Sequence, residues 1–148
     1  MATLDDVHAL ALALPETEEG TTYGNRAWKV RGKAFAWHRP LRAKELDHLG
    51  ADAPDGTVLA TCVEHEVAKR ALLDEGRPYF TTPHFDGYAI VLVELDALPP
   101  ADLEELVSEA WLARAPARLA REWLAARKRS AALAEVARIS EEFDGGYR

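Results

Sequence analysis

The sequence predicts an α+β fold: a single two-layer domain in which an antiparallel β-sheet packs against helices, with an extra C-terminal helical tail. Segments with the apolar spacing of helices alternate with short runs typical of strands, in the order helix, strands, helix, strands, helices. Several strand runs are separated by connections of hairpin length, which join antiparallel neighbours. The length of 148 residues, 48% of them hydrophobic, suits one hydrophobic core.

The N-terminal segment predicts a helix followed by a loop. Thr3 is a suitable N-cap, two acidic residues occupy the first turn, and apolar residues recur at three- and four-residue spacing up to Pro15. Segment 16–25 is polar and contains two glycines, so we expect a loop there.

A predicted hairpin follows this loop. Segments 27–30 and 33–38 have the composition of strands and flank the turn residues Arg31 and Gly32. Segment 39–56 contains two prolines and two glycines. We expect most of it to be a long loop, with at most a short strand or turn.

The middle of the chain predicts a helix placed between strands. Segment 57–63 is apolar and suits a strand, while segment 64–75 has helical spacing and ends before a glycine. Two further strands are expected at 79–82 and 88–95, because the stretch between them is rich in turn residues.

The C-terminal part predicts two more helices and a tail. One helix covers about 101–114 and is introduced by two prolines, and the next begins at Pro116 and runs to about residue 127. Beyond it the helical periodicity is weak. We therefore expect a domain spanning residues 1–128 and a C-terminal extension, 129–148, that is partly helical or disordered.

Composition argues against several classes of protein. The chain has no run of 18 apolar residues and no basic cluster in its first six residues, so we expect no membrane span, no signal peptide and a cytoplasmic location. A formal charge of −7 opposes strong nonspecific binding to nucleic acid. The single cysteine, Cys62, lies in an apolar stretch and is expected to pack as a small hydrophobic side chain.

Positive charge nevertheless concentrates in one segment. Residues 26–44 contain seven Lys and Arg side chains, no acid, and interleaved aromatic residues. This pattern predicts a nucleic-acid-binding hairpin in which cations contact phosphates and an exposed Trp stacks on a base. The candidate residues are Lys29, Arg31, Lys33, Trp37 and Arg39. The alternative is a solvated outer sheet face above a core of Trp28, Val30 and Phe35.

A second candidate site is the turn in the segment PYFTTPHFDGY at 78–88. It combines four aromatic side chains with hydroxyl, imidazole and carboxylate groups, which together can line the mouth of a ligand pocket. The candidate ligand-binding residues are Tyr23, Thr82, His84, Asp86 and Tyr88. The same residue types also form purely structural turns, and that interpretation remains open.

No motif in the sequence predicts catalysis, a metal site or a cofactor. Neither the His84 and Asp86 pair nor the cluster at 64–66 has a recognised ligand spacing. A nucleophile elbow, a phosphate-binding P-loop and a dinucleotide fingerprint are all missing. We therefore expect no catalytic residues, no metal ligands and no cofactor, and a protein that is not an enzyme.

Four segments occur in the same order as in a known family. They are EEGTTYG at 18–24, WKVRGKAF at 28–35, YFTTPHFDGY at 79–88 and AWLARAPARL at 110–119. This set resembles the MmcQ/YjbR family of small bacterial proteins, which are often labelled DNA-binding. The resemblance implies a compact α+β fold with an antiparallel sheet, comparable to the CyaY or secretion-chaperone type of two-layer architecture.

These observations predict a nonenzymatic binding protein of the MmcQ/YjbR type that binds DNA through the basic hairpin. The alternative is a module that binds an unidentified protein or a small ligand through the turn at Tyr79–Tyr88, with no nucleic-acid role. The two hypotheses differ in the surface they require around residues 26–44. A continuous positive groove favours DNA, whereas acidic side chains among the cations favour the alternative.

Overall fold

The computed structural model describes the backbone of residues 1–146 and the side chains of residues 1–142. Within this part of the chain, five α-helices and six β-strands form two compact units, one ending at Ala115 and the other beginning at Pro116. The first unit is an α+β domain built on one antiparallel sheet, which confirms the predicted fold class. The second unit contains a single long helix.

The sheet has the strand order β1-β2-β3-β4-β6-β5, and every neighbouring pair is antiparallel. The strands are β1 (Thr17–Thr22), β2 (Asn25–Val30), β3 (Lys33–His38), β4 (Val58–Cys62), β5 (Tyr79–Phe80) and β6 (Ile90–Glu94). The first three strands are joined by two-residue turns. This connectivity places the predicted basic hairpin, β2 and β3, beside the centre of the sheet.

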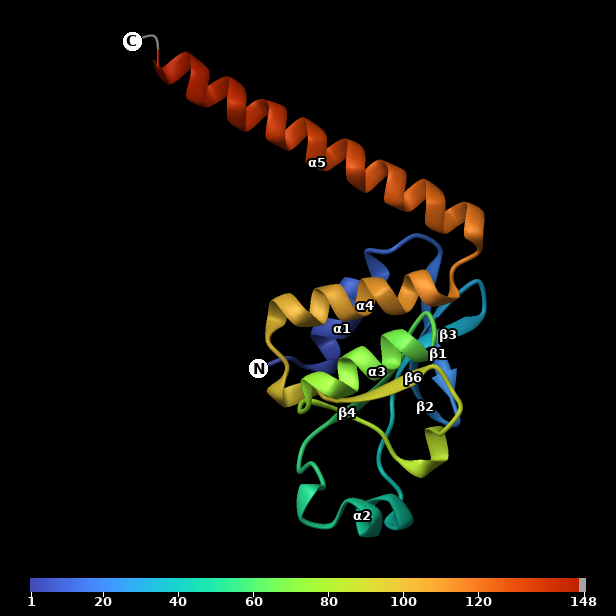
Figure 1. Cartoon of the computed structure of the whole chain (residues 1–148). Helices are drawn as coiled ribbons and strands as arrows, with labels where there is room; N and C mark the ends of the chain where they lie inside the picture. Colours follow the sequence, from blue (N-terminus) through green and yellow to red (C-terminus); the bar gives the residue numbers. More distant parts are fainter. Residues whose placement is uncertain (147–148) are drawn as a thin grey trace. The chain divides into compact units, whose positions relative to one another are not determined.

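Three helices cover one face of the sheet (Figure 1). Helix α1 (Leu4–Leu12) packs against β1, α4 (Pro100–Arg114) against β3 and β4, and α3 (Glu66–Glu75) against β5 and β6. The remaining helix of this unit, α2 (Ala43–Leu49), lies in the connection between β3 and β4. The opposite face of the sheet is therefore covered mainly by connections rather than by long helices.

The core between the sheet and these helices is apolar and closely packed. Its largest fully buried side chains include Trp28, Phe35, Leu59, Leu103 and Trp111. Burying each large apolar side chain contributes about 1.5–3 kcal/mol, so these contacts hold the two layers together. The two indole N–H groups are also satisfied, because one donates to His8 Nδ1 and the other to the carbonyl oxygen of Pro15, each over 3.1 Å.

A β-bulge in β3 decides which of its side chains face the helices. The pairing moves from Trp28 with Ala36 to Lys29 with Ala34, which leaves Phe35 as an extra residue. In a bulge, two consecutive side chains share one face, so Phe35 and Ala36 both enter the helix-side core. Ala34 and Trp37 consequently lie together on the opposite face.

Two predicted loops are wrong. Segment 16–25 contains strand β1, which was missed because its sequence, TEEGTT, has no apolar alternation and its stability comes from backbone pairing with β2. Segment 39–56 contains α2 and a short 3₁₀ helix, and seven residues are too few to display helical periodicity.

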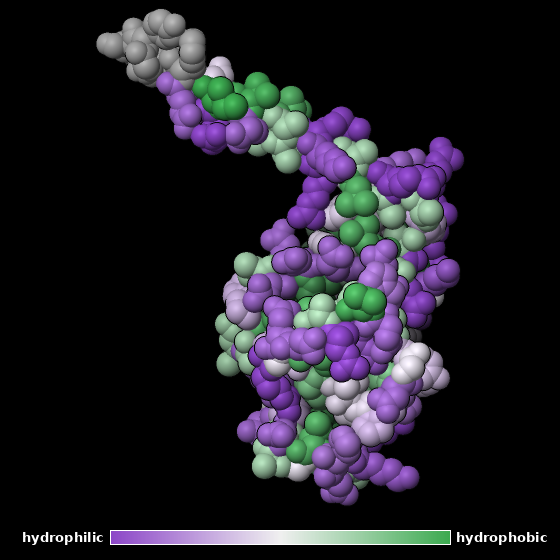
Figure 2. Space-filling model, viewed as in Figure 1, coloured by the Kyte–Doolittle hydropathy of each residue, from purple (hydrophilic) through white to green (hydrophobic). Residues whose placement is uncertain are grey.

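The second unit is one continuous helix, α5 (Ala117–Gly146). Its predicted first part is confirmed, but the helix does not stop near residue 127. Residues with high helix propensity continue past this point, and the ion pair of Arg138 with Glu142 adds local support. Apolar residues of α5, among them Leu133 and Val136, are exposed. Figure 2 shows apolar and hydrophilic surface side by side on this helix. Residues 147–148 of the predicted extension lie outside the described residues, and the predicted domain boundary at residue 128 stays a prediction.

None of the helices in the described part of the chain combines the length and apolar character needed to cross a bilayer.

Candidate ligand-binding site

A pocket of about 520 Å³ lies on the face of the sheet opposite the helix layer. Seven side chains with rings or positive charge line it, and we refer to these residues as the aromatic pocket. They are Tyr23, Lys33, Trp37, His84, Phe85, Tyr88 and Arg114. The pocket therefore combines residues from both predicted sites, the basic hairpin and the turn before β6.

The floor of the pocket is Trp37, whose position follows from the bulge in β3. Its register partners are Ala27 on β2 and Ala60 on β4, so two small residues flank the indole. The side chain is only 7% exposed. Trp37 is therefore a pocket floor, and an arrangement in which it projects into solvent to stack on a base is not observed.

The wall formed by Tyr23 comes from the turn between β1 and β2. Tyr23 and Gly24 are the two loop residues, and both have positive φ, at 52° and 79°. This is the backbone of a tight hairpin turn of the kind that favours Asn-Gly. A tyrosine here adopts a conformation that costs about 1–2 kcal/mol relative to the ordinary regions. Its side chain is 90% exposed, so packing does not offset that cost.

The opposite wall comes from the segment between β5 and β6. A short 3₁₀ helix, Pro83–Phe85, presents His84, whose ring meets Phe85 edge-on, and Tyr88 follows it. The buried Lys69 of α3 fastens this segment, because its Nζ donates to the carbonyl oxygens of Phe85 and Tyr88, each over 2.8 Å. Lys69 was not predicted as a site residue. A lysine on the apolar face of a helix, three residues before Leu72, could have indicated a buried ammonium group with polar partners.

Two of the predicted site residues belong to a buried polar network beneath the pocket. The guanidinium of Arg39 donates to both carboxylate oxygens of Glu45, over 2.9 and 3.1 Å, and also lies over the Phe85 ring. The Thr82 hydroxyl donates to Glu45 over 2.8 Å. Arg39 is 6% exposed and Thr82 is buried, so these residues brace the site from inside and are not part of its surface.

The charge state of Glu45 follows from these contacts. Burial alone would raise the pKa of this carboxyl group, because it disfavours the charged form. Hydrogen bonds from the Arg42 amide and the Thr82 hydroxyl, together with hydrogen bonding and charge attraction from Arg39, outweigh burial and hold its pKa below the ordinary value. Glu45 was not among the predicted residues, because no sequence pattern links it to Arg39 and Thr82.

The basic hairpin does not form a continuous positive groove. Arg26 pairs with Glu19 and, over 3.5 Å, with Asp5, while Arg31 pairs with Glu16 over 2.8 Å. The pKa of Glu16 is lowered by its hydrogen bond from Arg31. Acidic side chains from the missed strand β1, from the residue before it and from α1 therefore lie among the predicted cations. Lys29 runs along Gly20 on β1, and among the five predicted nucleic-acid residues only Lys33 and Trp37 line the pocket.

The aromatic pocket itself has a positive character. Lys33 and Arg114 contribute two cations, and no lining residue carries a carboxylate. Arg114 was not predicted; it lies at the end of α4, and its Nε contacts the Sγ atom of Cys62 over 3.3 Å. Burial raises the pKa of the Cys62 thiol despite this neighbour, which agrees with its expected role as a packed side chain.

The remaining predicted ligand residues are divided by the fold. Tyr23, His84 and Tyr88 line the pocket, whereas Asp86 is exposed and lies outside its lining. A smaller adjoining cavity of about 270 Å³ shares Tyr23 and Trp37 and reaches Arg42. Among the side chains that the structure describes, no three His, Cys, Asp or Glu residues are grouped so that they could hold a metal ion.

The part of the chain that is similar to known proteins includes most residues of this site. The YjbR family model matches residues 12–113, which include every residue of the aromatic pocket except Arg114. Uncharacterized proteins of Mycobacterium bovis and Mycobacterium tuberculosis are 45% identical over 129 residues, covering 84% of this chain and 98% of theirs. The crystal structure of Deinococcus radiodurans protein DR2400, a DUF419 protein, is 20% identical, with a TM-score of 0.56. The matched part spans 76% of this chain and 78% of the DR2400 chain, and this likeness supports the fold alone.

Proposed function

The chain belongs to the YjbR family, and from this premise we propose that it is a nonenzymatic binding protein whose aromatic pocket holds a small ligand with a planar ring and an anionic group. One observation carries the proposal. The pocket gathers ring side chains from three separate parts of the chain around a space with two cations and no carboxylate. Its volume lies within the range of small-molecule sites.

The ring side chains favour a planar ligand. Tyr23 and Tyr88 are 90% and 60% exposed, and Trp37 provides an apolar floor between them. A ring inserted here would remove aromatic surface from water and gain about 0.5–1.5 kcal/mol for each well-placed aromatic contact. The strained backbone of Tyr23 supports the same interpretation, because strain in a fold concentrates where it serves a site.

The two cations favour an anionic group on the ligand. Lys33 is exposed at the start of β3, and Arg114 reaches the pocket from the end of α4. A guanidinium can bind a carboxylate or phosphate through two parallel hydrogen bonds, and an ammonium adds a point charge. In the described part of the chain, His84 contacts the Phe85 ring and makes no hydrogen bond to a carboxylate, which supports a proposal of binding without reaction.

DNA binding is a second candidate, supported by one feature of the same surface. The exposed Tyr23 lies between Lys33 in the aromatic pocket and Arg42 in the adjoining cavity. Such an arrangement suits a single strand that stacks one base and places phosphates on the flanking cations. Duplex binding through the hairpin is less well supported, because Arg26 and Arg31 already pair with acids and Arg39 is buried.

The first test uses 1-anilinonaphthalene-8-sulfonate, a planar aromatic anion, with the full chain. We expect saturable binding to the folded protein, followed by dye fluorescence. The double variant Tyr23→Ala, Tyr88→Ala should weaken binding about 10-fold or more, which corresponds to about 1.4 kcal/mol. Lys33→Ala should weaken it about 3-fold or more, since it removes one exposed charge.

The matched control is Lys29→Ala, which removes the same charge from the same hairpin outside the pocket lining. It should leave dye binding unchanged within about 2-fold. Dye binding that does not respond to the tyrosine and Lys33 variants would reject the pocket. A labelled single-stranded DNA provides the second arm at low salt. If DNA binds and is weakened by Lys29→Ala with Arg31→Ala but not by the pocket variants, the hairpin hypothesis replaces the pocket.

A further inference from the structure

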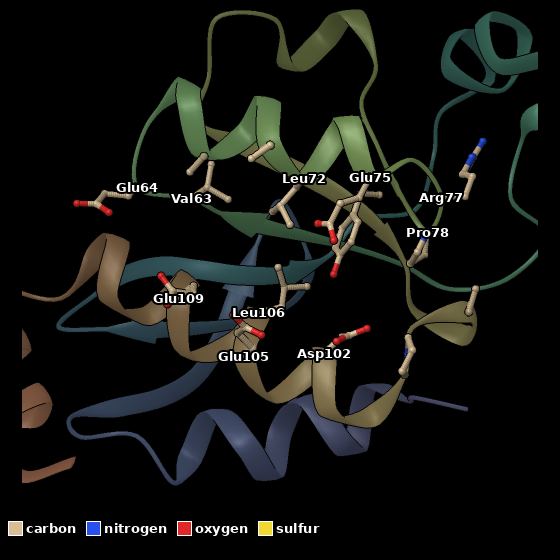
Figure 3. A pocket seen from close by; sticks show the side chains of 15 residues that line it. Val63, Glu64, Leu72, Glu75, Arg77, Pro78, Asp102, Glu105, Leu106 and Glu109 are labelled. Atoms are coloured by element: carbon tan, nitrogen blue, oxygen red, sulfur yellow. The ribbon is translucent and has the colours of Figure 1, made fainter. Parts of the chain in front are cut away.

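A second concavity lies on the helix-covered side of the sheet, between α3 and α4 (Figure 3). It has a volume of about 590 Å³, and its floor is apolar. Leu72 of α3 and Leu106 of α4 contribute to the floor, together with Val63 at the end of β4. The helix layer is therefore open at this position, where Leu72 is half-buried above the buried side chains of Leu106 and Val63.

Carboxylates line both walls of this concavity, which we call the acidic groove. They are Glu64, Glu75, Asp102, Glu105 and Glu109. The three on α4 are spaced by three and four residues, which places them on one face of the helix. Glu64 and Glu109 lie toward one end of the groove, while Glu75 and Asp102 lie farther along it (Figure 3). Negative charge is thus distributed along the groove rather than gathered at a single point.

These carboxylates are not neutralised within the domain. No ion pair in the described part of the chain joins any of the five to a cation. Arg77 is the one cation among the lining residues, and it pairs with Glu94 over 3.2 Å while its guanidinium lies over the Phe80 ring. Burial and the nearby carboxylates also raise the pKa of Tyr79 on the groove floor.

We propose that the acidic groove docks a basic amphipathic helix of a partner protein. The apolar face of such a helix would cover Leu72 and Leu106, as in other helix-in-groove complexes. Its flanking Lys or Arg side chains would meet carboxylates on both walls, which provides specificity as well as attraction. From Asp102 to Glu109 the α4 wall rises about 10 Å, or two helical turns, so cations in successive turns of the partner would have counterparts.

A helix is preferred to a small cation because the groove offers both kinds of contact. A polyamine would meet the carboxylates but would leave much of the apolar floor exposed to water. The inference is independent of the ligand proposed above, since the aromatic pocket lies on the opposite face of the sheet. A negative result in the test of one proposal therefore does not contradict the other.

The test measures fluorescence anisotropy of a labelled synthetic peptide of Leu and Lys, about four helical turns long, with Leu at helical spacing, against the full chain. We expect saturable binding. The triple variant Asp102→Asn, Glu105→Gln, Glu109→Gln should weaken it about 10-fold or more, because three counter-charges are lost. Leu72→Gln should also weaken binding, since it places a polar group in the floor.

A matched triple variant separates docking from general attraction to an acidic protein. Glu66→Gln, Asp74→Asn and Glu104→Gln remove three exposed carboxylates from the same helices outside the groove. This control should change the affinity less than about 2-fold at physiological salt, because these carboxylates do not line the groove and salt screens exposed charges. Equal weakening by both triples would overturn the proposal. So would equal binding of a peptide in which Leu is replaced by Ser, or displacement of the Leu-Lys peptide by spermine alone at similar concentration.

Discussion

At the scale of single residues, the site depends on side chains that never reach its surface. Lys69, Arg39, Glu45 and Thr82 are all buried, and their polar atoms are paired with one another or with carbonyl groups of the turn. They hold the segment that carries His84 and Tyr88 in place. Charged groups removed from water are costly when their partners are lost, so substitutions here should have larger effects than substitutions in the pocket.

Lys69→Met keeps the aliphatic length of the side chain and removes its ammonium group. The carbonyl oxygens of Phe85 and Tyr88 would lose their donor, so we expect the free energy of unfolding to fall by about 1–3 kcal/mol. Urea denaturation measures this, and dye binding should weaken because the turn loosens. Arg70→Met is the control on the exposed side of the same helix and should cost less than about 0.5 kcal/mol. Equal losses from both variants would contradict the assigned role of Lys69.

Glu45→Gln leaves the buried guanidinium of Arg39 without a counter-charge. We expect a loss of about 3–5 kcal/mol in the free energy of unfolding, as for other broken buried pairs. Thr82→Val removes only one hydrogen bond and should cost about 1 kcal/mol. If Glu45→Gln costs no more than Thr82→Val at neutral pH, the ion pair contributes little and the network is mainly steric.

The same pair predicts a dependence of stability on pH. The folded pKa of Glu45 lies below its ordinary value of 4.5. At pH values between the folded pKa and 4.5, the unfolded chain therefore binds more protons than the folded one. The contribution of Glu45 is therefore complete above about pH 4.5 and is lost as the pH falls through the folded pKa. Unfolding measured between pH 7 and pH 3 should show a smaller decline in Glu45→Gln than in the parent protein. Parallel curves would contradict this assignment.

At the scale of elements, the first two hairpins set the position and the charge of the site. Strand β1 supplies Glu19, which pairs with Arg26, and Glu16 just before it pairs with Arg31. The β1–β2 turn presents Tyr23 in a backbone conformation suited to other residues. One short polar strand and its turn therefore reduce the free positive charge of the basic hairpin and contribute an exposed ring to the aromatic pocket.

Tyr23→Asn is predicted to separate stability from binding. Asparagine followed by Gly24 suits this turn, and Tyr23 makes little contact in its exposed position, so the free energy of unfolding should rise by about 0.5–1 kcal/mol. Dye affinity should fall, because one wall of the pocket is lost. Arg31→Asn in the following turn is the comparison and should leave dye affinity unchanged. A destabilised Tyr23→Asn variant would mean that the tyrosine has a structural role.

At the scale of the whole domain, surface charge is divided between the two sides of the sheet. Cations line the aromatic pocket on one side, and five carboxylates line the acidic groove on the other. The net charge of −7 conceals this division, because it is a sum over the whole chain. An acidic protein can therefore present a site for an anion and, separately, a surface for a basic partner.

This division predicts that the two sites respond separately to substitution. The groove triple Asp102→Asn, Glu105→Gln, Glu109→Gln should change dye affinity less than about 2-fold at physiological salt, because none of the three carboxylates lines the pocket and salt screens the attraction between exposed charges. Dye titration of this variant measures the effect. A large gain in affinity would show that the acids of the groove repel anions from the pocket through the domain.

Much of the fold could be predicted because it is encoded in local patterns. The helical spacing of α4, the apolar run of β4 and the turn at Arg31 and Gly32 each identify an element from a few neighbouring residues. The side-chain chemistry of the pocket was equally visible, since Tyr23, His84 and Tyr88 were all candidates. Elements without apolar periodicity, such as β1 and α2, were not predictable in this way.

The sequence by itself determined the α+β class, the family pattern, and the supply of aromatic and basic side chains available to a site. Only the tertiary structure decided which of them meet. It buries Arg39 against Glu45, places acids from β1 and its neighbours beside the basic hairpin, and gathers Lys33 and Trp37 with the turn residues. The physical reason is that periodicity reports the local backbone, whereas strand pairing, the bulge in β3 and the burial of charge depend on residues distant in sequence.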